Sequence, residues 1–133
     1  MLFRRAVKSA RMPGMPAAIL GLILTLLLPG GRFNAYFTPA FTDAAYQKEA
    51  AAKVLKAWKP PASQPTGKKT VLIAQIAKDG ALAGLRDHLM TGAKSWDDAA
   101  VAAVKNAAPF APLPKSWGFA TMEVHFHFEA AAK

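Results

Sequence analysis

Two histidines stand two residues apart near the C-terminus, in a segment that alternates between apolar and polar residues. On an extended strand His125 and His127 point to the same side, beside Glu123, and imidazoles at such positions can share a metal ion. A third ligand such as His88 would have to come from another element, and no spacing in the sequence fixes one. The pattern is more typical of the solvent-facing side of a strand, so no metal site and no cofactor is predicted.

Catalysis would need an activated nucleophile, and the sequence holds no recognisable one. Its 133 residues include no cysteine, which excludes thiolate chemistry and disulfides. Ser63, Ser95 and Ser116 lack the G-x-S-x-G setting of a hydrolase. Ser95 has the spacing to Asp98 of a helix-capping box, and Asp97 and Asp98 are helix neighbours that point in different directions. We therefore predict no catalytic residues and no enzyme.

The formal charge of +9 at first suggests nucleic-acid binding, but the distribution of the charged residues along the sequence does not support it. Residues 1–40 contain five basic residues and no acidic one, which leaves twelve basic against eight acidic residues in the remainder. A basic stacking surface would use Trp58, which has core spacing, together with nearby lysines. Those lysines are Lys53, Lys56, Lys59, Lys68 and Lys69. A solvated basic face explains them better, and no nucleic-acid partner is predicted.

Residues 1–31 have the pattern of a signal peptide or an N-terminal membrane anchor. Four basic residues among the first eleven precede the apolar run 17–28, which is shorter than the ~20 residues of a full span. Thr38–Ala40 is a distant match to a cleavage site, so removal of this segment and its retention as a membrane anchor both stay open. In either case we expect the folded part to lie outside the cytoplasm, with residues 32–42 as a short linker.

The remaining sequence predicts a helix, a hairpin, a second helix and a last strand. Thr42 or Asp43 can cap the first helix, which ends before Pro60. Strand 70–77 turns at Asp79–Gly80 into strand 81–89, where Leu85 and Leu89 are the best core candidates. Strand 70–77 is apolar on both faces, so each face should be covered.

The C-terminal half continues with a helix that begins after Gly92 and stops before Pro109. The extended segment 109–114 can pin Phe110 and Leu113 to the domain as apolar plugs. Strand 120–128 follows, and residues 129–133 form a tail. In that strand Met122, Val124, Phe126 and Phe128 face inward, whereas Glu123, His125 and His127 face outward. We expect an α+β two-layer sandwich: a three-stranded antiparallel sheet with two helices on one face, and the last strand at an edge.

Residues 43–128 contain a series of short motifs in a definite order. They are Tyr46 with Trp58-Lys59-Pro60-Pro61, Asp79-Gly80, Thr91-Gly92, Trp96-Asp97-Asp98-Ala99-Ala100, Val104, Pro109-Phe110-x-Pro112-Leu113-Pro114 and Val124-x-Phe126-x-Phe128. Taken together, these motifs resemble the C-terminal domain of the TonB/TolA family of bacterial envelope proteins, which implies a periplasmic location. The resemblance implies a small α/β sandwich that binds an extended peptide at the exposed edge of its last strand.

In TonB-like proteins that peptide belongs to an outer-membrane transporter, and in TolA-like proteins the partners are other envelope proteins. Force-transducing members carry Ser and His in the membrane helix, and residues 17–28 contain neither. Residues 32–42 span at most ~40 Å when extended, far less than the long spacer of those members. These departures concern energy transduction and leave peptide or protein binding intact.

We therefore predict a non-enzymatic binding module of the cell envelope. Its partner-binding edge comprises Met122, Glu123, Val124, His125, Phe126, His127 and Phe128. Its partners are envelope proteins, and residues 17–28 provide a possible contact with the inner membrane. The alternative is a structural subunit in which the same edge joins a second copy in a homodimer or a larger envelope assembly.

Overall fold

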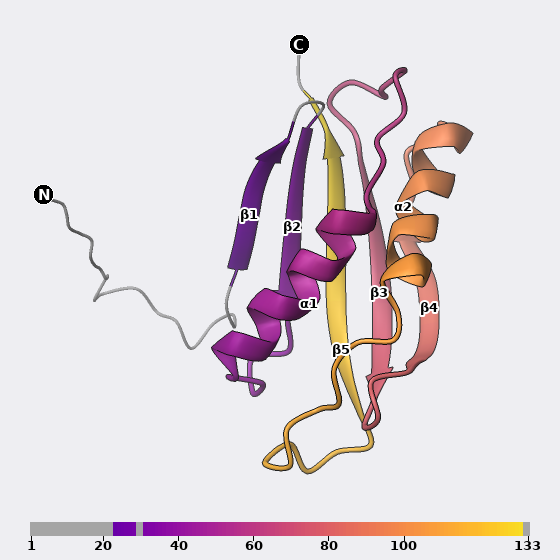
Figure 1. Cartoon of the computed structure of the whole chain (residues 1–133). Coiled ribbons are helices and arrows are strands. Elements are labelled where there is room, and N and C mark those ends of the chain that lie inside the picture. The colour runs from indigo at the N-terminus through magenta and orange to yellow at the C-terminus, as the bar shows by residue number, and fades with distance from the viewer. Residues whose placement is uncertain (1–22, 29–30, 132–133) are drawn as a thin grey trace, which may run out of the picture.

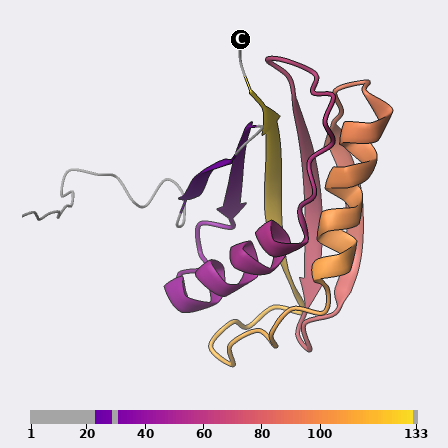
Figure 2. The same ribbon diagram turned by 45° about the horizontal axis from the view of Figure 1, so that its top comes forward.

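In residues 23–28 and 31–131, which the computed structural model describes, the chain forms five strands and two helices. They are β1 (Ile23–Leu28), β2 (Gly31–Phe37), α1 (Ala44–Ala57), β3 (Lys69–Ala77), β4 (Leu82–Leu89), α2 (Lys94–Ala107) and β5 (Thr121–Ala130). The strands form one antiparallel sheet in the order β1-β2-β5-β3-β4. Figure 1 shows both helices lying over one face of this sheet, and Figure 2 shows the same two layers from another side.

The predicted α+β architecture is confirmed, but the expected number of strands and the place of the last one are wrong. Residues 43–128 contribute β3, β4 and β5, the three strands that the sequence predicts. The N-terminal residues add β2 beside β5 and then β1 beyond it. The last strand therefore lies inside the sheet, because a segment expected to be a linker pairs with its outer edge.

Residues 32–42 are thus not a simple linker. Phe33, Ala35 and Phe37 alternate with polar residues and are buried, which is the pattern of a strand with one face on the core. Residues 23–28 of the expected signal or anchor form β1, while 1–22 lie outside the described residues. Among the described residues, neither α1 nor α2 has the length and apolar character that a membrane-spanning helix needs.

Helix α1 begins and ends where the sequence predicts. The Asp43 side chain accepts a hydrogen bond of 2.9 Å from the backbone N–H of Tyr46, so it caps the first turn. The helix stops at Ala57, and Trp58 already has extended backbone angles, two residues before Pro60. Val54 is buried on the inner side of the helix, and Trp58 is buried as expected from its spacing.

Strands β3 and β4 form the predicted hairpin around Gly80, whose φ is +93°. Val71 and Ile73 point away from the helices yet are buried among neighbouring strands, so both faces of β3 are covered. Leu85 packs against the core, but Leu89 is 46% exposed, which corrects its assignment to the core. Register shifts between β3 and β4 break the regular alternation there, so spacing alone misplaced Leu89.

Helix α2 begins two residues earlier than a Ser95 cap requires. Its N-cap is Ala93, which has no side-chain acceptor, and Ser95 lies inside the helix, so the predicted capping box is wrong. Asp97 is buried instead. Its carboxylate accepts hydrogen bonds from the hydroxyls of Thr70 and Thr91, at 2.6 and 2.9 Å, and from the backbone N–H groups of Thr91 and Gly92, both at 3.1 Å.

These bonds join α2, β3 and the loop before α2 at one carboxylate. Burial alone would raise the pKa of Asp97, but the hydrogen bonds from Thr70, Thr91 and Gly92 outweigh burial and lower it. Asp97 is therefore an ionised residue with a structural role: it holds β3 and the loop before α2 to the first turn of this helix.

The core lies between the sheet and the helices and is rich in aromatic rings. The ring of Trp58, which directly follows α1, lies 5.0 Å from the Trp96 ring of α2 and 4.7 Å from the Phe128 ring of β5. Phe110 and Leu113 are buried as predicted. The backbone N–H of Phe110 donates to the carbonyl of Gly80 at 2.8 Å, so the proline-rich segment is fixed to the β3–β4 turn.

Candidate functional site

Strand β5 has neighbours on both sides in this structure. It pairs with β3 from Thr121 to Glu129 and with β2 from Val124 to Ala130, so the prediction of a free edge at Met122–Phe128 is wrong for the whole chain. Beyond the end of β2, the backbone N–H and the hydroxyl of Thr38 both donate to the carbonyl of Glu123, at 3.3 and 2.9 Å. The sequence analysis missed this arrangement because a short alternating segment does not show which distant strand it pairs with.

The apolar side chains of β5 face the helices as predicted. Met122, Val124, Phe126 and Phe128 are all buried, and the carbonyl of Phe128 accepts a hydrogen bond of 3.2 Å from the indole N–H of Trp96. They therefore belong to the core. A partner alongside β5 would meet the backbone of this strand and the side chains on its outer face.

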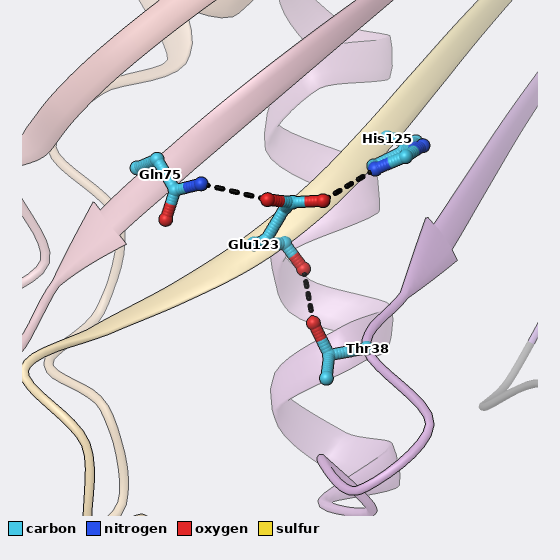
Figure 3. A network of polar contacts seen from close by, with 4 residues as sticks. All are labelled: Thr38, Gln75, Glu123 and His125. Atoms are coloured by element: carbon cyan, nitrogen blue, oxygen red, sulfur yellow. Dashed lines mark hydrogen bonds and ion pairs between the residues drawn. The ribbon is translucent and has the colours of Figure 1, made fainter.

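The outer face of β5 carries the three predicted polar residues, all half-buried. Figure 3 shows the contacts of Glu123: its carboxylate accepts a hydrogen bond of 2.8 Å from the Gln75 amide, and its other oxygen lies 2.7 Å from His125 Nε2. The His125 contact is the main reason that the pKa of Glu123 lies below its ordinary value; burial opposes it and Gln75 adds to it. Glu123 thus connects β3, β5 and the end of β2.

His127 lies further along the same face, against β2. Its ring centroid is 4.5 Å from that of Tyr36. Burial, with smaller contributions from the nearby charges of Lys69, His125 and His88, lowers the pKa of His127 to about 4. The imidazole is therefore neutral at physiological pH and acts as a packing group between the strands.

The third histidine of the chain, His88 on β4, also approaches this face. Its ring lies 6.4 Å from that of His125. No group of three or more His, Cys, Asp or Glu side chains in the described part of the chain is arranged to hold a metal ion. The histidines and Glu123 instead form a polar strip across β4 and β5.

The contact between β2 and β5 is the feature that sequence reasoning missed. Phe33 is fully buried, and its ring centroid lies 6.0 Å from that of Phe126 and 5.3 Å from that of Phe128. Ala35 is fully buried opposite Phe126, and Phe37 stacks on Phe41 at 6.4 Å. The alternation of Phe33, Ala35 and Phe37 is the signal that could have revealed this strand.

The outer edge of β4 pairs with no strand among residues 23–28 and 31–131. It is poorly suited to strand addition, because Arg86, Asp87 and His88 are exposed along it and its register with β3 shifts twice. Charged side chains and irregular pairing are common protection against strand addition at sheet edges. The regular β2–β5 boundary is therefore the better candidate for partner binding.

Comparison with protein families identifies the central part of the chain. The family model described as TonB C terminal matches residues 43–128, from the N-cap of α1 to Phe128 in β5. A search of curated proteins finds no significant match. The match covers both helices and strands β3, β4 and β5, and it leaves β1 and β2 outside. Because it spans well over half of the sequence, the chain belongs to the TonB C-terminal domain family.

Proposed function

We propose that this protein is a TonB-like interaction module of the cell envelope that binds an extended segment of a partner as an additional strand beside β5. One observation carries the proposal. In residues 43–128, which the family model matches, β5 would be an edge strand, and its present neighbour β2 comes from outside that range. This edge thus already accepts an extended segment, in regular antiparallel register from Val124 to Ala130.

The chemistry of such binding is that of backbone pairing. The N–H and C=O groups of Met122–Phe128 that face β2 provide the affinity, because an extended peptide of almost any sequence can pair with them. Glu123, His125 and His127 line the outer face beside that position and would select among partners through their charge and hydrogen bonding. The family is non-catalytic, in keeping with a function that rests on binding alone.

The partner class follows from the family. TonB C-terminal domains belong to the cell envelope, so the extended segment would come from an outer-membrane transporter or another periplasmic protein. Residues 1–22, which have a basic start and contain the first part of the apolar run, would direct the domain across the inner membrane and provide its contact there.

The direct test is an NMR titration of the ¹⁵N-labelled full-length chain with peptides from the periplasmic N-termini of the host's outer-membrane transporters. Binding beside β5 predicts amide shifts concentrated in Met122–Phe128 and in β2, with little change in β4. Peptides of scrambled sequence control for non-specific pairing. Shifts confined to β4, or none with any transporter peptide, would refute the proposed site or partner class.

Self-association is the second candidate, and the same pairing favours it. A β2 strand that pairs with β5 of its own chain can form the same ladder with β5 of another copy. Sedimentation of the full-length chain over a hundredfold range of concentration distinguishes the two functions. A dimer that forms without peptide, with intermolecular contacts between β2 and β5, would identify an assembly subunit; a monomer that binds transporter peptides would identify a receptor-binding module.

A further inference from the structure

We infer that β2 is a replaceable strand: it occupies in cis the position that a partner's segment takes beside β5. We also infer that the partner's segment has the same side-chain pattern as β2. In this pattern a large apolar residue, a small residue and a second large apolar residue stand at alternate positions. This inference rests on the proposed function and adds to it a mechanism of access and a sequence preference.

The two large positions are defined by Phe33 and Phe37. Phe33 packs on the rings of Phe126 and Phe128, which β5 contributes to the core, and Phe37 stacks on Phe41. Departure of β2 would expose these apolar surfaces to water, which is unfavourable. A partner segment must cover the same surfaces, so it needs large apolar side chains four residues apart.

The small position is defined by Ala35. This residue is fully buried and lies directly opposite Phe126 in the register of the two strands. A larger side chain there would have to displace packed core atoms, which destabilises the paired state of the two strands. A partner segment with alanine, glycine or serine at this position is therefore favoured over one with leucine or phenylalanine.

The ends of β2 set its register. Gly31 has a φ of +150°, and a Cβ atom there would lie only 2.0 Å from the carbonyl oxygen of Glu129. At the other end, Thr38 donates to the carbonyl of Glu123. Glycine at the first position and a hydrogen-bond donor after the last apolar residue are thus the fixed points that a competing segment must match.

Strand β2 would leave together with β1, which pairs with it on its other side. The segment 38–43 would remain as their connection to α1. The one ion pair between the side chains of β2 and β5 in the described chain, Arg32 with Glu129, is 4.0 Å long and half-exposed, so it contributes little. The elements that would remain are those that the family model matches.

The test uses a reversible covalent lock, which the absence of cysteine in the sequence permits. Arg32 and Glu129 are register partners on β2 and β5, so Arg32→Cys with Glu129→Cys places two thiols where a disulfide fits neighbouring strands. The matched control is Lys69→Cys with Glu129→Cys, which locks β5 to β3 on its other side. Both are made in the full-length chain.

The probe is the heptapeptide Gly-Arg-Phe-Asn-Ala-Tyr-Phe, identical to β2. Its control, Gly-Phe-Phe-Asn-Arg-Ala-Tyr, has the same composition, but its aromatic residues are displaced so that no large–small–large alternation remains. We expect the reduced Arg32→Cys/Glu129→Cys variant to bind the probe. Oxidation should weaken binding about tenfold or more, because a disulfide that holds β2 on β5 prevents the state in which the edge of β5 is free for the probe. The Lys69→Cys/Glu129→Cys variant should bind equally in both redox states, and the displaced peptide should bind neither variant.

A second variant tests access without a disulfide. Gly31→Ala places a Cβ against the carbonyl of Glu129, so it should loosen β2 and raise the apparent affinity for the probe about threefold or more. Gly118→Ala, in open space, is its control and should leave affinity unchanged. Equal binding by the oxidised and reduced Arg32→Cys/Glu129→Cys variant, or no binding of the probe to the reduced one, would overturn the inference.

The outcomes separate this inference from the proposed function. If transporter peptides bind the wild-type chain while oxidation of the Arg32→Cys/Glu129→Cys variant has no effect on their binding, the module binds partners elsewhere and β2 is a permanent strand. If the β2 peptide binds the reduced but not the oxidised variant while no transporter peptide binds, the inference that β2 is replaceable is supported and the proposed partner class is refuted.

Discussion

Phe33 of β2 stacks on Phe126 of β5, with ring centroids 6.0 Å apart and ring planes 18° from parallel. This contact joins a residue outside the family-matched range to the core strand of that range. Without β2, the sheet would have three strands with β5 at one edge. With β2 and β1 added, β5 lies inside a five-stranded sheet. The availability of the candidate binding edge thus depends on how firmly the N-terminal strand is held.

Replacement of Phe33 by alanine should measure how much the packing of β2 on β5 contributes to stability. Phe33 is fully buried against Phe126 and Phe128, so Phe33→Ala should lower the free energy of unfolding by about 3 kcal/mol. Arg32→Ala, at the exposed neighbouring position, should lower it by less than about 0.5 kcal/mol. Urea denaturation of both variants makes the comparison; equal, small losses would mean that β2 is not docked on β5 in solution.

Asp97 should be far more important for stability than its neighbour Asp98. Asp97→Ala leaves the hydroxyls of Thr70 and Thr91 and the N–H of Gly92 without their buried acceptor, so we expect a loss of about 3 kcal/mol. Asp98 forms an exposed pair with Lys94, so Asp98→Ala should cost less than about 0.5 kcal/mol. Similar midpoints for the two variants in thermal unfolding would contradict this role of Asp97.

Local sequence signals were sufficient for most of residues 43–128. The Asp43 cap, the Asp79–Gly80 turn and the alternation of Met122–Phe128 each act over a few residues, and each appears in the structure where expected. Such features depend on backbone preference and on a single buried face, both of which can be read from a short window. The two-layer arrangement followed from them.

The features that escaped prediction depend on residues distant in sequence. Strand β2 exists because its alternating residues meet β5, and the short apolar pattern of Phe33, Ala35 and Phe37 is ambiguous without that partner. The role of Asp97 depends on Thr70, which lies on β3. The assignment of residues 129–133 to a tail was also incomplete, because Glu129 and the buried Ala130 extend β5.

Gly80 and Gly67 provide a matched pair for the effect of a methyl group. Both have positive φ, +93° and +77°, so alanine is strained at either position by about 1 kcal/mol. A Cβ on Gly80 would also lie 2.0 Å from the carbonyl oxygen of Phe110, whereas nothing lies within 4 Å at Gly67. Gly80→Ala should therefore cost about 3 kcal/mol or more in denaturant titrations, and Gly67→Ala about 1 kcal/mol; equal costs would show that the proline-rich segment is not fixed to this turn.

His127 should make the domain less stable as the pH falls. Its pKa in the folded state is about 4, against an ordinary value of 6.5, so between these values the unfolded chain binds a proton that the folded chain does not. The resulting loss on acidification is on the order of 1–2 kcal/mol, because each pKa unit corresponds to about 1.4 kcal/mol and solvent screens this half-buried site.

The measurement that isolates this effect is the difference in unfolding free energy between the wild type and His127→Gln at successive pH values. Glutamine cannot take up the proton, so the variant should lose less stability than the wild type from pH 6.5 down to about 4, the range set by the two pKa values of His127. Ser116→Gln, at an exposed position and without a titratable group, is the control and should keep the wild-type slope. Parallel curves for wild type and His127→Gln would show that Tyr36 and the β2 strand do not bury this imidazole in solution, and would therefore argue against a docked β2.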